Sequence, residues 1–111
     1  MKKILFTLLL VIGVAVAANA QVRFTDKNLD AVREEATQQN KLVFIDLYAT
    51  WCGPCKNMER NVFSQPEVGD FMAQHFIAAK YDIDKPTGSA LAKKYGIRSI
   101  PTFLIFDTEG T

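Results

Sequence analysis

The stretch that decides the fold is WCGPCK, residues 51–56, which holds both cysteines of the chain. It lies where an apolar run gives way to a helical pattern, so Cys52 falls at a helix start. Unpaired backbone N–H groups and the helix dipole favour an anion there, and hence a thiolate that can attack a disulfide. Cys55 lies one turn further along and can resolve the mixed disulfide. The spacing therefore predicts a redox site.

Gly53 and Pro54 fit the turn between the apolar run and the helix. Glycine allows the backbone to turn tightly. Proline suits the first turn of a helix, because the N–H that it lacks would have no intrahelical partner there. The sequence around the two cysteines therefore predicts a strand, a tight turn and a helix.

Three other uses of a cysteine pair compete with a redox site. A structural disulfide across so short a loop would stabilise the fold by only about 2 kcal/mol on the chain-entropy relation. A zinc site normally needs four ligands, and besides the cysteines the chain offers only His75, which we expect at a helix end. Covalent haem attachment is excluded because Lys56, not histidine, follows the second cysteine. We expect no metal and no cofactor other than the redox-active disulfide Cys52–Cys55.

The chain has 111 residues, a net charge of +1 and 49% hydrophobic residues, which fits one small globular domain without a basic patch for nucleic acid. Residues 1–20 have the pattern of a secretory signal peptide: a basic pair, the apolar run 4–18 and Ala-Asn-Ala at 18–20. An uncleaved anchor is the alternative. Export would place the mature chain, residues 21–111, in the periplasm or outside the cell. A thiol pair stays reduced there only if a partner supplies electrons.

One polar residue interrupts the apolar run of residues 42–49, which has the composition of a central strand covered on both faces. Asp46 would be buried in that strand, and burial raises a carboxyl pKa because it disfavours the charged form. Lying six residues before Cys52, it could exchange a proton with Cys55 directly or through water. The alternative is an aspartate that faces solvent at a sheet edge.

Helical patterns alternate with apolar strands, which predicts an α/β fold with a central, mostly parallel sheet flanked by helices. The first helix should run to about Asn40 from a cap at Asp26 or Asn28. We expect Ser64 and Thr87 to cap two later helices.

Two further strands are expected after the cysteine motif. Residues 76–82 form the first, with Lys80 as its polar exception, and residues 102–106 form the second, which the chain enters through Pro101. Between them, Gly96 should end a helix in the left-handed conformation.

These patterns resemble the thioredoxin superfamily over most of the mature chain. The resemblance rests on the cysteine motif, on Asp46 at the buried-acid position, on AKYDID at 79–84 and on YGIRSIPT at 95–102. It implies a thioredoxin-like fold. In that family the strand that ends here near Gly110 is followed by an antiparallel edge strand and a C-terminal helix. We therefore expect residues 21–111 to be a thioredoxin-like domain that is truncated before those elements.

The resemblance also implies roles for individual residues. The residues matching Cys52 and Cys55 are the nucleophile and the resolving thiol, those matching Asp46 and Lys80 form a buried acid–lysine pair, and the proline matching Pro101 is cis. We expect the residues around the dithiol to form the apolar surface that docks substrate, namely Trp51, Gly53, Pro54, Ile100 and Pro101.

The segment at 61–68 is similar to secreted bacterial thioredoxin-like proteins and to the exported C-terminal domain of the thiol:disulfide interchange protein DsbD. This finer resemblance implies a periplasmic protein-disulfide reductase that acts on disulfide-containing proteins. It would draw electrons from a membrane or periplasmic thiol donor, and we expect a monomer. The alternatives are a non-catalytic thioredoxin-fold binding module and a disulfide oxidase or isomerase.

Overall fold

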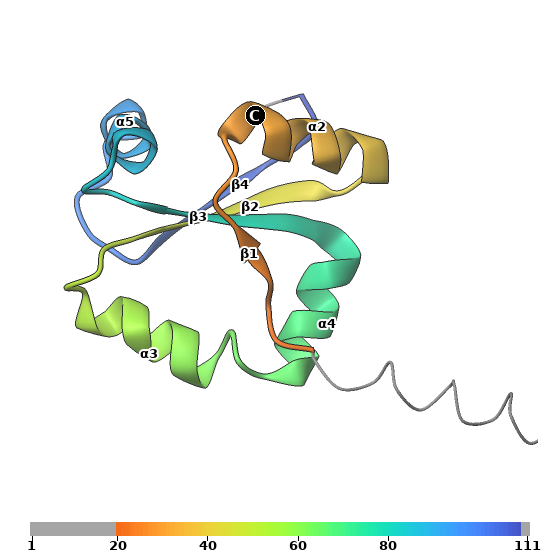
Figure 1. The fold of residues 1–111 in the computed structure, drawn as a ribbon, viewed down its shortest axis with the longest axis horizontal. Coiled ribbons are helices and arrows are strands. Elements are labelled where there is room, and N and C mark those ends of the chain that lie inside the picture. Colours follow the sequence, from red (N-terminus) through yellow and green to blue (C-terminus); the bar gives the residue numbers. More distant parts are fainter. Residues whose placement is uncertain (1–19, 110–111) are drawn as a thin grey trace, which may run out of the picture.

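The computed structural model describes residues 20–109 and shows a four-stranded sheet with helices on both faces (Figure 1). The strands are β1 (Phe24–Thr25), β2 (Leu42–Tyr48), β3 (Phe76–Asp82) and β4 (Thr102–Phe106). The helices are α2 (Leu29–Gln39), α3 (Gly53–Asn61), α4 (Pro66–His75) and α5 (Pro86–Lys94). Of the predicted signal peptide, only Ala20 belongs to the described residues. Within residues 20–109, no helix is long and apolar enough to cross a membrane.

The strand order is β1-β3-β2-β4, which places β2 and β3 at the centre of the sheet. β1 and β2 both pair with β3 in parallel, whereas β4 pairs antiparallel with β2. The mostly parallel sheet and the α/β class predicted from the sequence are therefore confirmed. The pairing sets Asp46 of β2 opposite Lys80 on one side and opposite Phe103 on the other.

The two faces of the sheet are covered by different helices, α2 and α5 on one face and α3 and α4 on the other (Figure 1). Successive side chains of β2 point to alternate faces. Val43, Ile45 and Leu47 are completely buried in the cluster that includes α2 and α5. Phe44 belongs to the opposite cluster, where its ring meets Phe63 edge-on at 6.3 Å between centroids. One strand thus supplies both layers of the core.

Two helix starts differ from the prediction. α4 begins at Pro66 and α5 at Pro86, and neither helix has a side-chain cap. The predicted caps Ser64 and Thr87 are therefore wrong. The fixed φ of proline is already helical, so each helix begins at its proline. The Ser64 hydroxyl instead donates to the carbonyl oxygen of Arg60.

The other predicted helix ends are confirmed. Asn28 caps α2, where its side chain accepts from the backbone N–H of Ala31 at 2.8 Å, so Asp26 is not the cap. Asn40 follows α2 in the left-handed conformation, with φ of 55°. Gly96 also adopts the left-handed conformation, with φ of 63°, just after α5.

Candidate active site

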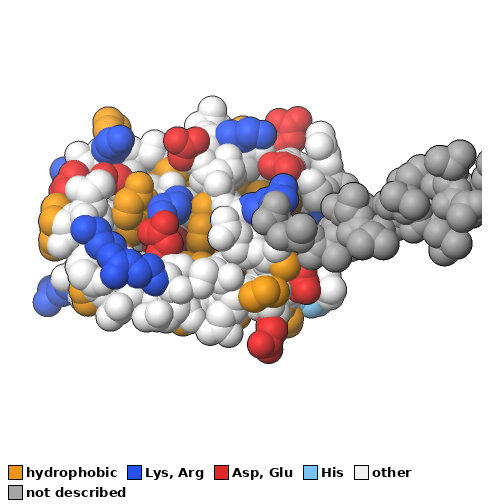
Figure 2. Space-filling model, turned by 60° about the horizontal axis from the view of Figure 1, so that its bottom comes forward, with side chains coloured by type: hydrophobic (Ala, Val, Ile, Leu, Met, Phe, Trp, Pro, Cys, Tyr) orange, Lys and Arg blue, Asp and Glu red, His pale blue; other side chains and the backbone are white. Residues whose placement is uncertain are grey.

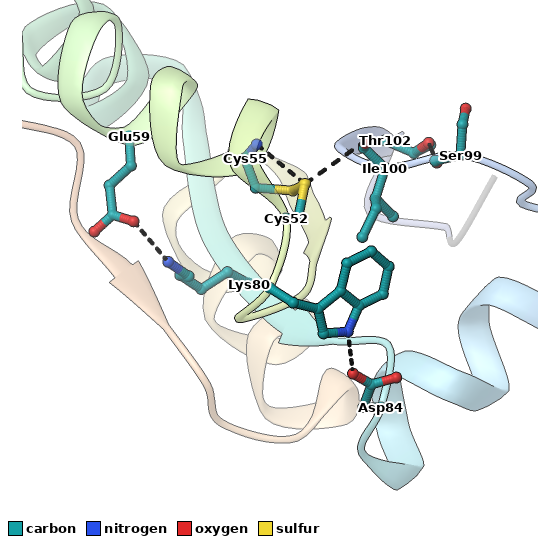
Figure 3. Close-up of a disulfide and its surroundings, with 9 residues drawn as sticks. Cys52, Cys55, Glu59, Lys80, Asp84, Ser99, Ile100 and Thr102 are labelled. Atoms are coloured by element: carbon teal, nitrogen blue, oxygen red, sulfur yellow. Dashed lines mark hydrogen bonds and ion pairs between the residues drawn. A yellow bond between two sulfur atoms is a disulfide. The ribbon is translucent and has the colours of Figure 1, made fainter.

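The two cysteines lie at the start of α3 and are joined by a disulfide (Figure 3). Cys52 is the N-cap residue, and its Sγ accepts from the backbone N–H of Cys55 at 3.1 Å. The predicted helix-start position of Cys52 is therefore confirmed. A backbone N–H that points at this sulfur, together with the helix dipole, favours the thiolate when the disulfide opens.

The Ile100-Pro101 segment lies beside the dithiol, although it is far from the cysteines in the sequence (Figure 3). Its peptide bond is cis, as the resemblance implied. The carbonyl oxygen of Ile100 lies 3.8 Å from Cys52 Sγ. The Ile100 side chain packs against the buried cluster of Ala49, Cys52 and Cys55. Two distant segments therefore meet at the sulfur that we expect to attack.

Trp51 lies next to Cys52 in the chain, and 66% of its surface is exposed. Its indole Nε1 donates to Oδ2 of Asp84 at 2.8 Å. Asp84 is itself held by its backbone N–H, which donates to Oδ1 of Asp82 at 2.9 Å. Sequence reasoning missed Asp84, because nothing in the local pattern around it points to the indole. The contact gives an exposed aromatic side chain a fixed orientation.

Gly53 and Pro54 form the first turn of α3 and are exposed. A Cβ atom added at Gly53 would meet no atom within 4 Å, so space is open above this turn. The structure thus brings Trp51, Gly53, Pro54, Ile100 and the cis proline around the dithiol, and their role in docking substrate stays a prediction.

Asp46 is buried on the α3 side of β2, with 6% of its surface exposed. Its pKa is raised to about 6, chiefly by burial; the Lys80 ammonium opposes this rise and the Glu59 carboxylate adds to it. Its Oδ1 is buried without a hydrogen-bond partner. The prediction of a buried carboxyl with a raised pKa is confirmed, and the alternative of a solvent-facing aspartate at a sheet edge is wrong.

A cavity of about 220 Å³ connects this carboxyl to the dithiol. It is lined by residues of β2, its following loop, α3 and β3, namely Asp46, Tyr48, Ala49, Thr50, Cys55, Lys56, Glu59 and Lys80. One molecule of liquid water takes up about 30 Å³, so the cavity has room for several. The geometry therefore allows a proton to pass between Cys55 and Asp46 through water.

The expected pairing of Lys80 with Asp46 needs correction. The two residues are opposite one another in the sheet, but the ion pair that Lys80 makes is with Glu59, at 3.9 Å between Nζ and Oε2 (Figure 3). The Lys80 ammonium also lies over the ring of Tyr48, 4.3 Å from its centroid. Glu59 was missed, although its position four residues after Cys55 places both on one side of a helix.

No group of three potential ligands that could hold a metal ion occurs within residues 20–109. His75 ends α4, as predicted, and its ring lies 4.6 Å from that of Phe71. It is not among the residues that line the cavity.

Comparison with known proteins agrees with the dithiol geometry. A family model described as thioredoxin-like matches residues 23–108. The chain belongs to this thioredoxin-like family. A solution structure of a candidate disulphide-isomerase from Bacteroides thetaiotaomicron shares 35% identity and a TM-score of 0.74, over 83% of this chain and 76% of that one.

Two named proteins with similar sequences are a thioredoxin and a thiol:disulfide interchange protein. Thioredoxin-1 of Drosophila melanogaster is 43% identical over 65 residues, which are 59% of this chain and 56% of that protein. The thiol:disulfide interchange protein DsbD of Klebsiella pneumoniae is 35% identical over 100 residues, which are 86% of this chain and 17% of that protein. The chain thus spans about half of the thioredoxin and a small part of DsbD.

Proposed function

We propose that this thioredoxin-like chain is a thiol-disulfide oxidoreductase that reduces disulfide bonds in proteins outside the cytoplasm. The observation that carries the proposal is the arrangement around the dithiol. Cys52 caps α3, and Cys55 opens onto a cavity whose far wall holds the buried carboxyl of Asp46. This order supports the roles that we propose: Cys52 as the nucleophile, Cys55 as the resolving thiol and Asp46 as the proton acceptor.

In the first step the Cys52 thiolate of the reduced protein attacks one sulfur of a substrate disulfide. The substrate S–S bond breaks, its other sulfur leaves as a thiolate and takes up a proton, and a mixed disulfide joins Cys52 to the substrate. The N-cap position and the Cys55 N–H stabilise the Cys52 thiolate that begins this step.

In the second step the Cys55 thiol gives its proton to Asp46, through the water that the cavity can hold. The Cys55 thiolate attacks Cys52 Sγ, the mixed disulfide breaks, and the second substrate sulfur leaves as a thiolate. The substrate has then gained two electrons, and the protein holds the Cys52–Cys55 disulfide seen in the structure. A membrane or periplasmic thiol donor then supplies two electrons, which reduce the Cys52–Cys55 disulfide for the next cycle.

The raised pKa of Asp46, about 6, suits this task. A carboxylate with an ordinary pKa is a weak base toward a thiol whose own pKa is near 8.5. Raising the carboxyl pKa reduces the difference between the pKa values of the carboxyl and the thiol. Asp46 is still mostly ionised at pH 7 and able to accept the proton.

Substrate docking would use the apolar surface around Cys52. Trp51 is exposed and oriented by Asp84, and the Ile100 carbonyl stands beside Cys52 Sγ, where an extended substrate segment could pair with the backbone. Gly53 and Pro54 leave the approach open. This surface suits protein substrates that present an accessible disulfide.

Two considerations support a reductase outside the cytoplasm. The residues between the cysteines, Gly53 and Pro54, supply no cation to make the thiolate an exceptionally good leaving group, which an oxidase needs. The N-terminal sequence has the pattern of a secretory signal peptide, and the match to DsbD covers 86% of this chain. We propose a periplasmic or secreted monomer.

The test is the reduction of insulin by dithiothreitol, followed as precipitation of the freed chains. The proposal expects the chain to accelerate precipitation and Cys52→Ser to abolish the acceleration. A binding module would bind insulin without acceleration, and that result would overturn the proposal. Refolding of scrambled ribonuclease by the pre-reduced protein, with no dithiothreitol present, would instead identify an isomerase.

A further inference from the structure

Lys80 stands between two carboxylates at the wall of the Asp46 cavity. The register of the sheet places it opposite Asp46, and both residues line the cavity. Its ammonium is nevertheless directed to Glu59 on α3, as Figure 3 shows. The Tyr48 ring beneath the ammonium favours the same position through a cation–π contact. Lys80 therefore has two possible anionic partners, and the structure shows it with the outer one.

Asp46 lacks the partner that its strand neighbour could supply. Its Oδ1 is buried and has no hydrogen-bond partner, although Lys80 lies directly opposite Asp46 on β3. The titratable and charged groups that face this cavity are Cys55, Lys56 and Glu59 from α3, Lys80 from β3 and Tyr48 from β2. On the remaining side, β4 presents the apolar Phe103. Of the two lysines that line the cavity, Lys80 is the one that neighbours Asp46 in the sheet and makes the ion pair with Glu59, so these two carboxylates compete for it.

We propose that Glu59 is a positioning residue for the thiol chemistry. By holding Lys80 at the outer wall of the cavity, it keeps the ammonium away from the Asp46 carboxylate and leaves that carboxylate free to take the proton of Cys55. Glu59 does not touch the sulfur atoms in this scheme. It acts through Lys80, and its effect on turnover rests on the function proposed above.

The direction of the effect follows from elementary electrostatics. An opposite charge within about 4–6 Å of a carboxylate lowers its pKa by about 1–3. If Lys80 paired directly with Asp46, the carboxylate would be stabilised and would become a poorer base toward the thiol. Glu59 prevents this pairing, and its own negative charge works in the same direction. The side chain of Glu59 is 66% exposed, so its replacement should leave the fold unchanged.

The experiment is a carboxyl-carbon NMR titration of Asp46 in the oxidised protein, for Glu59→Gln, Lys80→Met and the double variant. We expect Glu59→Gln to lower the Asp46 pKa by about 1, because Lys80 is then free to approach. In the Lys80→Met background the same change should have less than half that effect. Glu34→Gln is the matched control, because it removes the same charge from an exposed position on α2.

Equal effects of Glu59→Gln with and without Lys80 would overturn the proposal, because Glu59 would then act on Asp46 directly. An unchanged Asp46 pKa in Glu59→Gln would also overturn it. The titration needs no turnover, so a failed insulin assay with the expected titration would refute the proposed function and leave the placement of Lys80 intact. If the chain is active, Glu59→Gln should slow mixed-disulfide resolution at pH 7 by roughly threefold to tenfold, whereas Glu34→Gln should not.

Discussion

The two faces of strand β2 differ in how completely they are packed and in what they contain. Toward α2 and α5 the strand presents Val43, Ile45 and Leu47, each with 0% of its surface exposed. Toward α3 and α4 it presents Phe44 and Asp46, where the carboxyl has an unpaired oxygen and borders a cavity. A dense apolar layer therefore lies directly behind a polar, hollow one.

This difference assigns separate tasks to the two layers. Complete burial without polar groups is the main source of folding stability. A buried carboxyl beside a cavity lowers stability, because neither packing nor a hydrogen bond offsets its desolvation. On the face of α3 and α4 this loss of stability occurs beside the dithiol, where we propose that Asp46 acts as a base. Figure 2 shows the same side of the molecule, where charged and hydrophobic side chains are interspersed.

The largest expected effect falls on turnover and leaves the packed face untouched. Cys55→Ser should attack substrate through Cys52 but fail to release it, so that a covalent mixed disulfide accumulates and turnover falls to background. Mass spectrometry under non-reducing conditions measures the adduct. Faster alkylation of Cys55 than of Cys52 in the reduced protein at neutral pH would contradict this assignment of roles.

Ile45→Ala tests the packed face. We expect a loss of about 2–5 kcal/mol in the free energy of unfolding, because the deleted groups leave a cavity in a fully buried site. Turnover per folded molecule should stay within twofold of the original. Denaturant unfolding and insulin reduction below the transition measure the two quantities. A variant of normal stability but reduced activity would mean that the two layers do not have separate tasks.

Asp46→Asn tests the hollow face. An amide has the shape of the carboxyl but cannot take the Cys55 proton, so resolution should slow by roughly a hundredfold at pH 7. In the original protein the rate should rise as pH increases through about 6, where Asp46 ionises, and the variant should lack this inflection. Stopped-flow measurement of mixed-disulfide decay gives the profile. Identical profiles for both proteins would show that Asp46 takes no part in proton transfer.

The same variant should also alter the pH dependence of stability. The folded protein keeps the Asp46 proton up to about pH 6, whereas the unfolded chain releases it near 3.8. The folded state therefore binds more protons between these values, and its stability should fall as pH rises through that window. The loss should be on the order of 1 kcal/mol, because the cavity admits solvent that screens part of the desolvation. Asp46→Asn should remove this decline.

The smallest effect is expected at the exposed margin of the hollow face. Ile105 lies on β4 opposite Phe44, and 54% of its surface is exposed. Ile105→Thr should change the free energy of unfolding by less than about 0.5 kcal/mol. It should also reduce aggregation, because a polar residue interrupts the apolar run of an edge strand. Light scattering during thermal unfolding measures the second effect, and a loss above 2 kcal/mol would place Ile105 in the core.

The elements that sequence could predict are those with a local signature. The apolar run at 42–49 identified the central strand, and Asp46 was noticeable as its only charged residue. The cysteine spacing predicted the redox site, and the residues flanking the cis Pro101 supported the family. These patterns lie within a few consecutive residues, so they can be recognised without any knowledge of tertiary contacts.

Contacts between distant segments could not be predicted in this way. The hydrogen bond from Trp51 to Asp84 joins residues 33 positions apart, and the choice of Lys80 between two carboxylates depends on side-chain placement. Gly88 lies within α5, where a Cβ would come within 2.1 Å of the Asp82 carbonyl oxygen, and nothing in the local sequence indicates that close approach. β1 has only two residues, too few to show any periodicity.

We propose that the hollow face of β2 supports a dithiol that reduces other disulfides. Its most direct test is the equilibrium reduction potential of Cys52–Cys55, measured by titration against glutathione or dithiothreitol at pH 7. We expect a value near the −270 mV of thioredoxin, a member of the same superfamily, at roughly −230 mV or below. A value near the −120 mV of the strongly oxidising DsbA, at roughly −150 mV or above, would contradict it, because such a disulfide would take electrons from substrates.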